Sequence, residues 1–129
     1  MGCGSSSEGE FKNGSPDFNY SEILQCFQNG NGLCFHLTNK RNGQWAFYND
    51  TKKYEMHVAV NFRQGSDVVA LGNTNMEIED ETGENVATVV VFPGETELFI
   101  EGDVVGYKAR IQALPLSEEY KAHMKEMGK

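Results

Sequence analysis

Hydrophobic and polar residues alternate with a period of two along most of the chain after residue 31. The clearest case is residues 54–62, where the largely apolar set is Tyr54, Met56, Val58, Val60 and Phe62. The positions between them carry Glu55, His57, Ala59 and Asn61. Alternation of this kind places the two sets on opposite faces of a β-strand. We therefore expect one face of this strand to enter the core.

Further strands are predicted where short apolar or alternating runs stand between turn-forming residues. They cover residues 33–37, 44–48, 68–71, 76–79, 86–92, 96–101 and 104–113. Asn42-Gly43 predicts a tight turn that joins the first two runs as a hairpin, and Gly102-Asp103 predicts a second hairpin between the last two. Residues 49–51 are expected to form a loop. Residues 86–92 are apolar on both faces, which predicts a central buried strand.

The pattern differs at the two ends of the chain. Residues 18–28 place Ile23, Leu24 and Phe27 on one face of a short predicted helical turn that ends at Asn29-Gly30. Residues 117–129 predict a short or fraying helix, with Ser117 as its N-cap, acidic residues early and lysines late. Residues 1–17 are mostly small and polar, and the predicted state of this segment is disordered.

About seven or eight short strands with short connections, and no long helical pattern between them, predict an all-β, mainly antiparallel fold. The expected shape is a compact sandwich or barrel-like domain. The length of 129 residues suits one such domain. We divide the chain into a disordered tether at residues 1–17, a β-domain at residues 18–120 and a mobile C-terminus at residues 121–129.

The first seven residues, Met-Gly-Cys-Gly-Ser-Ser-Ser, fit the N-myristoylation pattern M-G-x-x-x-[ST], with Ser6 in the hydroxyl position. Gly2 is the expected N-myristoylation site, because removal of Met1 leaves its amine free. Cys3 beside it is the expected S-palmitoylation site. The start of the chain therefore predicts a lipid-anchored protein.

The formal net charge of −8 changes what such an anchor needs. An anionic inner leaflet repels an acidic protein, and the chain has no polybasic patch to offset that repulsion. A myristoyl chain alone gives only reversible binding, with a partition constant on the order of 10⁴ M⁻¹. A palmitoyl chain adds roughly 12 kcal/mol from its buried methylenes. We therefore expect stable residence on the membrane to need Cys3. The acidic balance also excludes nucleic acid as a partner.

The expected cellular compartment follows from the lack of a membrane span and of a secretory signal in the sequence. No apolar run reaches 18 residues, and no basic segment precedes an apolar one at the start, so neither a membrane span nor a secretory signal is expected. The expected location is the cytoplasmic face of a membrane. Cys26 and Cys34 are expected to stay reduced there.

No catalytic or metal chemistry is expected. Cys34 and His36 would share one face of a strand, but no oxyanion-hole motif or nucleophile turn accompanies them. His57 and His123 are interpreted as surface residues. The acidic run at residues 77–84 lacks the ligand ladder of a calcium loop, and no zinc spacing or phosphate loop occurs. We therefore predict no metal, no cofactor and no enzyme activity.

Aromatic residues gather in the two strands on either side of the predicted loop at residues 49–51. Most of them are expected to be core. The alternative is that some line a groove for a peptide or lipid. The candidates for that partner or ligand surface are Trp45, Phe47, Tyr48 and Tyr54.

The chain resembles the small myristoylated proteins of kinetoplastid parasites, which consist of a calpain-related domain without a protease domain. The resemblance extends over nearly the whole chain. It rests on Met1-Gly2-Cys3-Gly4 and on residues 31–33, 44–51, 54–58, 70–72, 94–97, 99–102 and 113–120.

The resemblance implies a β-rich domain at the cytoplasmic face of the plasma or flagellar membrane, calpain-like in name but without peptidase activity. Together with the residues, it favours a non-enzymatic, dually acylated adaptor or scaffold that links this membrane to an unidentified protein partner, for which the cytoskeleton is the candidate source. The alternative is a carrier module for a lipid or peptide with an acyl-dependent switch.

Overall fold

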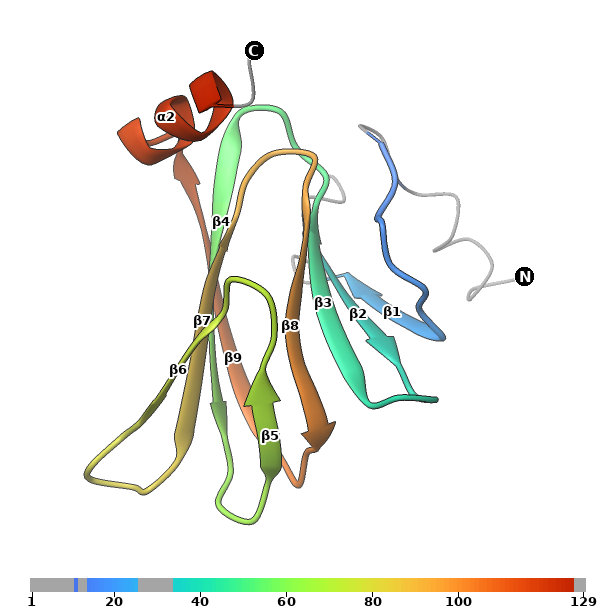
Figure 1. Ribbon diagram of the computed structural model, residues 1–129, viewed down its shortest axis with the longest axis vertical. Coiled ribbons are helices and arrows are strands. Elements are labelled where there is room, and N and C mark those ends of the chain that lie inside the picture. The colour runs from blue at the N-terminus through green and yellow to red at the C-terminus, as the bar shows by residue number, and fades with distance from the viewer. Residues whose placement is uncertain (1–10, 12–13, 26–33, 127–129) are drawn as a thin grey trace.

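The chain folds into two β-sheets packed face to face, with a helix at one end (Figure 1). The computed structural model describes Phe11 and residues 14–25 and 34–126. Every strand pair in these ranges is antiparallel. The predicted all-β, antiparallel fold is therefore confirmed, and of the two predicted shapes the protein adopts the sandwich.

The first sheet has five strands in the order β1-β2-β3-β8-β5. Their bounds are Glu22–Gln25 for β1, Cys34–Asn39 for β2, Gln44–Asn49 for β3, Thr96–Asp103 for β8 and Asp67–Ala70 for β5. The second sheet has four strands in the order β6-β7-β4-β9. Their bounds are Asn75–Ile78 for β6, Asn85–Val91 for β7, Tyr54–Phe62 for β4 and Tyr107–Pro115 for β9.

The C-terminal helix α2 spans Glu118–Glu126, so the predicted helix is confirmed. Ser117 is its N-cap, because the backbone N–H of Tyr120 donates to Ser117 Oγ at 3.2 Å. The helix runs across the boundary between residues 120 and 121, where we placed the start of the mobile C-terminus. No helix among the described residues is long and apolar enough to cross a membrane.

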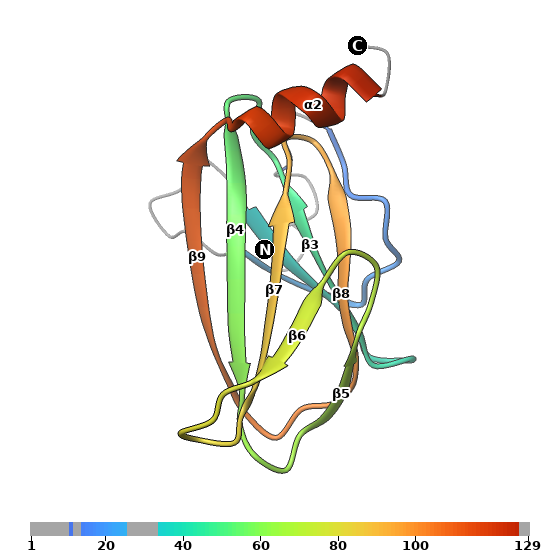
Figure 2. The same ribbon diagram turned by 60° about the vertical axis from the view of Figure 1, so that its left-hand side comes forward.

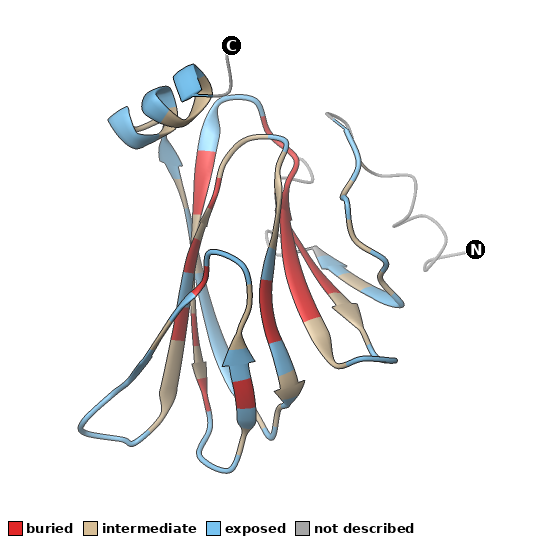
Figure 3. Cartoon of the chain, in the orientation of Figure 1, coloured by how far each residue is buried: buried red, intermediate tan, exposed pale blue. Residues whose placement is uncertain are grey.

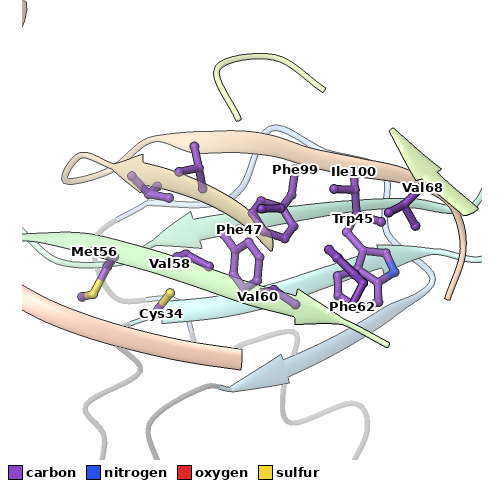
Figure 4. Close-up of a cluster of buried hydrophobic side chains, with 13 residues drawn as sticks. Cys34, Trp45, Phe47, Met56, Val58, Val60, Phe62, Val68, Phe99 and Ile100 are labelled. Atoms are coloured by element: carbon purple, nitrogen blue, oxygen red, sulfur yellow. The ribbon is translucent and has the colours of Figure 1, made fainter. Parts of the chain in front are cut away.

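The core lies between the sheets, where the alternating apolar positions of facing strands meet (Figure 3). Met56, Val58, Val60 and Phe62 of β4 are all buried there, as their alternation predicts. Figure 4 shows them beside aromatic side chains of the opposite sheet, among them Phe47. The two phenylalanines Phe47 and Phe99 meet edge to face at 5.0 Å, a favoured aromatic geometry.

The predicted helical turn near the N-terminus is wrong within the described residues, because residues 22–25 form strand β1. Ile23 and Leu24 are adjacent, so a strand sends them to opposite faces. Ile23 packs on a hydrophobic cluster, whereas Leu24 is 57% exposed. Pairing with β2 outweighs the local helical pattern, since it satisfies the backbone of both strands. The rest of the predicted turn lies outside the described residues.

The second predicted hairpin is also wrong. β8 pairs with β3 and β5 in the first sheet, whereas β9 pairs with β4 in the second. The chain crosses between sheets at residues 104–106, and Gly102-Asp103 belongs to β8 rather than to a turn. By contrast, the first predicted hairpin is confirmed, with β2 and β3 joined through Asn42-Gly43.

Strand β7 is central in its sheet, as predicted, because β6 and β4 flank it. It is not buried on both faces. Ala87, Val89 and Val91 are buried in the core, whereas Thr88 on the outer face is exposed and Val90 is half-buried. The outer face of this sheet is therefore only partly covered.

Gly102→Ala is expected to destabilise the protein by about 2–3 kcal/mol. Gly102 has a φ of +144°, and an added Cβ would collide with the backbone carbonyl oxygen of Asp67. The edge strand β5 must then move away from β8. Denaturant unfolding measures the loss, and faster amide exchange confined to β5 would locate it.

Gly94→Ala is the matched control for this substitution. Gly94 also has a positive φ, of +75°, but no atom lies within 4 Å of an added Cβ. Its expected cost is about 1 kcal/mol, from backbone strain alone. Equal losses for the two variants would contradict a steric role for Gly102.

Candidate functional site

The predicted lipidation sites, Gly2 and Cys3, lie outside the described residues. Phe11 is the described residue nearest to them in sequence. Its ring meets Phe35 edge-on at 4.9 Å and Tyr48 edge-on at 5.4 Å. Each such pair contributes about 0.5–1.5 kcal/mol beyond burial. The described residue nearest to the predicted lipids is thus packed on the β-domain.

We define the N-terminal strap as Phe11 and residues 14–21. It crosses the outer face of the first sheet and covers a second hydrophobic cluster, separate from the main core. The buried residues of this cluster are Phe35, Leu37, Ala46 and Tyr48, and the side chains packed over them are Phe11, Phe18, Tyr20 and Ile23. The sandwich therefore has a third layer on this side.

Polar contacts hold the strap at three points. The backbone N–H of Asp17 donates to Thr96 Oγ1 at 2.9 Å, and Asn39 Nδ2 donates to the carbonyl oxygen of Asn19 at 2.8 Å. The backbone N–H of Ser21 donates to Thr38 O at 2.8 Å. Contacts with the β-domain thus begin before residue 18, where we placed its boundary.

The predicted aromatic surface is divided among three environments. Trp45 and Phe47 point into the main core, and Tyr48 lies under the strap on the opposite face of β3. Tyr54 alone of the four is substantially exposed, at 43%. Adjacent residues of a strand point to opposite faces, so the alternation along β3 already predicts that Tyr48 and Phe47 lie on different sides of the sheet. These four residues do not form one surface.

Tyr48 is anchored by a buried hydrogen bond, since its hydroxyl donates to Asp50 Oδ1 at 3.0 Å. Burial raises the pKa of Tyr48 well above its ordinary value, and the hydrogen bond and the charge of Asp50 add to that shift. Tyr48 therefore acts as a structural link between the strap, β3 and the following loop.

A cavity of about 940 Å³ lies on the outer face of the second sheet, and we call it the groove. Two rows of paired residues cross its floor. One row is Gln112, His57 and Val90, and the other is Arg110, Ala59, Thr88 and Asn75. Figure 2 shows this sheet, with α2 lying across its end. The groove therefore combines carboxamide, hydroxyl and cationic groups with the apolar side chains of Ala59 and Val90.

Glu55 attaches the start of α2 to this sheet. Its Oε1 accepts hydrogen bonds from Ser117 N at 3.0 Å and from Ser117 Oγ at 2.7 Å, and its Oε2 lies 2.6 Å from His57 Nε2. Burial by itself raises the pKa of Glu55, but the bonds from Ser117 and His57 outweigh it and hold that pKa below the ordinary value. Glu55 is therefore held as a buried carboxylate.

A second contact holds the middle of the helix. His123 Nε2 lies 2.7 Å from Glu95 Oε2, and the His123 ring lies 5.0 Å from that of Phe92. Nearby, burial raises the pKa of Glu97, and the charge of Glu95 adds to this shift. His57 and His123 were expected at the surface, but both are half-buried and paired with carboxylates.

Cys34 and His36 share one face of β2, as predicted, and both are buried. The His36 ring lies 4.3 Å from Trp45 and 4.9 Å from Phe47. Its Nε2 has no hydrogen-bond partner among the described residues. Burial lowers the pKa of His36 to about 4, so the ring is neutral at neutral pH.

Acidification is expected to destabilise the protein through His36. The unfolded chain protonates this residue near pH 6.5, whereas the folded protein does so only near pH 4. The unfolded state therefore binds more protons between these values, and stability falls as the pH drops through them, by up to about 3 kcal/mol. Urea unfolding between pH 7 and pH 4 measures the slope.

His36→Phe is expected to flatten that pH dependence, because it keeps an aromatic ring beside Trp45 and removes the titrating group. His123→Gln, which changes a half-buried histidine, is the control and is expected to keep most of the slope. A His36→Phe protein with an unchanged slope would contradict this assignment.

Within the described ranges, no three His, Cys, Asp or Glu side chains gather closely enough to hold a metal ion. The groove brings together His57, His123 and Arg110, a combination that no sequence motif predicts. They come from β4, α2 and β9, and only the sheet register and the position of the helix make them neighbours.

The fold and these surfaces define an antiparallel β-sandwich with a strapped first sheet and a grooved second sheet. Residues 11–116 match the family model described as domain of unknown function DUF1935, so the chain belongs to that family. A comparison with curated proteins finds no match.

Two solved structures from Leishmania major are similar to the chain. The NMR structure of the small myristoylated protein SMP-1 is 52% identical, with a TM-score of 0.88 and coverage of 100% of both chains. A protein described as hypothetical is 33% identical, with a TM-score of 0.70, covering 80% of this chain and 91% of its own. The resemblance to the small myristoylated proteins is therefore confirmed.

Proposed function

We propose that this protein is a non-enzymatic, dually acylated adaptor on the inner leaflet of the plasma or flagellar membrane. The observation that carries the proposal is full-length similarity to a small myristoylated protein, at 52% identity, combined with Gly2 and Ser6 in the myristoylation pattern. In this proposal Gly2 carries myristate and the β-domain meets a protein partner.

Cys3 is proposed to carry the second lipid. A single myristoyl chain gives marginal binding, and the usual supplement is a second chain or a polybasic patch. The chain has 19 acidic and 11 basic residues, which leaves palmitate as the supplement. The adjacent position of Cys3 places its thiol at the membrane once myristate has inserted.

The groove is proposed as the surface that receives the protein partner. Asn75 and Gln112 present carboxamides, and Arg110 presents a guanidinium, around a floor that includes Ala59 and Val90. Carboxamides both donate and accept hydrogen bonds, so they suit the backbone of an extended peptide. The absence of enzyme activity is supported by Cys34, which is sealed in the core, and by His57 and His123, which are paired with glutamates.

Mass spectrometry of the protein from its native membrane tests the two lipids. The expected product lacks Met1 and carries one myristoyl group on Gly2 and one hydroxylamine-sensitive palmitoyl group on Cys3. Crosslinking from the groove in the same membranes tests the adaptor role. An unacylated Gly2 would overturn the proposed anchor, and crosslinks only to lipid would overturn the adaptor.

The second candidate function is a carrier for a lipid or peptide with an acyl-dependent switch. The volume of the groove favours it, since about 940 Å³ falls in the range of ligand pockets, roughly 300–1,000 Å³. Amide chemical shifts of myristoylated and unmodified protein separate the two functions. Widespread changes within residues 33–113 would favour the carrier, whereas changes confined to the N-terminal residues favour the adaptor.

A further inference from the structure

The strap shortens the link between the predicted lipids and the β-domain. Phe11, which packs on Phe35 and Tyr48, lies nine positions after Gly2. A chain segment of that length spans at most about 30 Å, and a random coil of the same length has a root-mean-square span of about 16 Å. A domain of about 100 residues has a radius of gyration near 13 Å, so the link is shorter than the domain is wide.

Without the strap, the first residue fixed in a sheet would be Glu22 of β1. The link would then contain about twice as many residues, with a root-mean-square span near 25 Å. A domain on that longer link could turn any side toward the bilayer. Packing of Phe11 and Phe18 on the first sheet therefore restricts which side of the domain stays near the lipid.

An acidic run lies on the side of the molecule away from the strap (Figure 1). The acidic run of residues 77–84 forms β6 and the turn into β7, at the lower left of Figure 1, whereas the strap lies at the right. Figure 2 also places the turn between β6 and β7, at its lower left, away from the strap. Stacked sheets pack about 10 Å apart, and the strap forms a further layer on the first sheet. An acidic turn on the second sheet is therefore farther from the strap side than the roughly 8–10 Å over which salt leaves charges unscreened.

Two cationic residues lie in a turn beside the strap. Lys40 and Arg41 stand in the turn between β2 and β3, and Lys40 N donates to Ser21 Oγ of the strap at 2.9 Å. The Lys40 side chain is paired with Glu22 at 2.8 Å. Arg41 is exposed, and its guanidinium has no acidic partner among the residues that the structure describes. Anionic headgroups can pair with Arg41 on this side.

We propose that the strap makes the outer face of the first sheet the membrane-facing side of the protein. The bilayer then lies against the strap and the turn that carries Arg41, and the groove on the second sheet opens toward the cytosol. This inference rests on the proposed acylation of Gly2. This orientation also keeps the acidic run of residues 77–84 away from an anionic leaflet.

Paramagnetic relaxation from the membrane tests this orientation. The fully acylated protein is bound to nanodiscs of phosphatidylcholine and phosphatidylserine that contain a gadolinium-chelating lipid. Amides of Asn19 and Arg41 are expected to relax roughly tenfold or more faster than those of Thr88 and Gln112. The effect falls with the sixth power of distance, and the two sides differ by about one domain diameter.

Two variants separate the strap from other causes. The double variant Phe11→Ser, Phe18→Ser releases the strap and keeps Gly2 and Cys3. Membrane binding is expected to be unchanged, whereas the difference in amide relaxation between the two faces is expected to fall several-fold. A flexible insertion of about twenty Gly and Ser residues after Ser7 lengthens the link without touching the strap, and the same loss is expected. Tyr54→Ser, at an exposed aromatic away from the strap, is the control and is expected to keep the difference.

Equal relaxation of both faces in membrane-bound wild-type protein would overturn the inference and leave the lipid anchor intact. Faster relaxation at the groove would overturn it as well, because the opposite side would then face the bilayer. Failure of the acylated protein to bind nanodiscs at all would instead overturn the proposed function.

Discussion

Gly2→Ala is expected to move the protein from the membrane fraction almost entirely to the soluble fraction. Alanine at this position removes the glycine that the myristoylation pattern requires. Without myristate, Cys3 is not delivered to a membrane-bound acyltransferase, so the second lipid is lost too. Fractionation of cells that express the full chain, with immunoblotting of both fractions, measures the change.

Cys3→Ser is the matched variant, because it keeps Gly2 and removes only the palmitoylation site. It is expected to retain myristate and to divide between the fractions, since one myristoyl chain binds reversibly, on the order of 10⁴ M⁻¹. A Cys3→Ser protein wholly in the membrane fraction would contradict the need for a second lipid. A Gly2→Ala protein that stays on membranes would contradict the anchor itself.

Asn49→Ala is expected to lower the free energy of unfolding by about 4 kcal/mol, because the buried N–H of Thr51 and the buried carbonyl oxygen of Val91 each lose this partner, at roughly 1–3 kcal/mol each. Asn49 is fully buried where the chain passes from β3 toward β4. Its Nδ2 donates to the carbonyl oxygens of Tyr54 and Val91, both at 2.8 Å, and its Oδ1 accepts from Thr51 N at 3.0 Å. One side chain thus joins the first sheet to the second.

The backbone of Asn49 reinforces this role, since its N–H donates to Glu95 O and its carbonyl oxygen accepts from Gly94 N. Equilibrium unfolding in urea measures the loss. Asn73→Ala is the control, because its carboxamide bonds only the side chain of Glu97 and is exposed; its expected effect is within about 0.5 kcal/mol. Similar losses for both variants would contradict the bridging role of Asn49.

In the proposed arrangement, a rigid connection joins the acylated N-terminus to the groove. Asn49 holds the two sheets together, and the strap joins the first sheet to the segment that leads to Gly2. Because the groove is on the second sheet, the orientation proposed for it depends on both connections. Loosening either one is expected to affect partner binding without any change in the groove itself.

Much of the secondary structure could be predicted because its signal is local. Residues 54–62 alternate without interruption, and β4 has those bounds. Asn42-Gly43 marks the turn between β2 and β3 because glycine accepts the φ of +72° found at Gly43. Ser117 followed by two glutamates marks the start of α2. Each of these signals needs only neighbours along the chain.

Pairing could not be predicted in the same way. Residues 96–101 and 104–113 were predicted to form a hairpin, yet the strands that they form belong to different sheets. Ile23 and Leu24 fit a helical face as well as a strand, and pairing with β2 decided between them. Alternation says which side of a strand is apolar, but it does not say which strand lies alongside.

The candidate site shows the same division. Trp45 and Phe47 were candidates for a ligand surface, yet the opposite sheet covers them. Asn49 was read as part of a loop, although it is the polar bridge between the sheets. The groove and the strap were not foreseen, because their side chains come from segments far apart in the sequence.

The sequence alone determined the all-β class, the positions of most strands and the predicted lipid sites at Gly2 and Cys3, because periodicity and terminal motifs are encoded in adjacent residues. Only the tertiary structure decided the sandwich, the order of its strands, the strap and the groove. These depend on which apolar faces bury one another and on which distant backbones share hydrogen bonds. That choice is a property of the whole chain, and no single segment carries it.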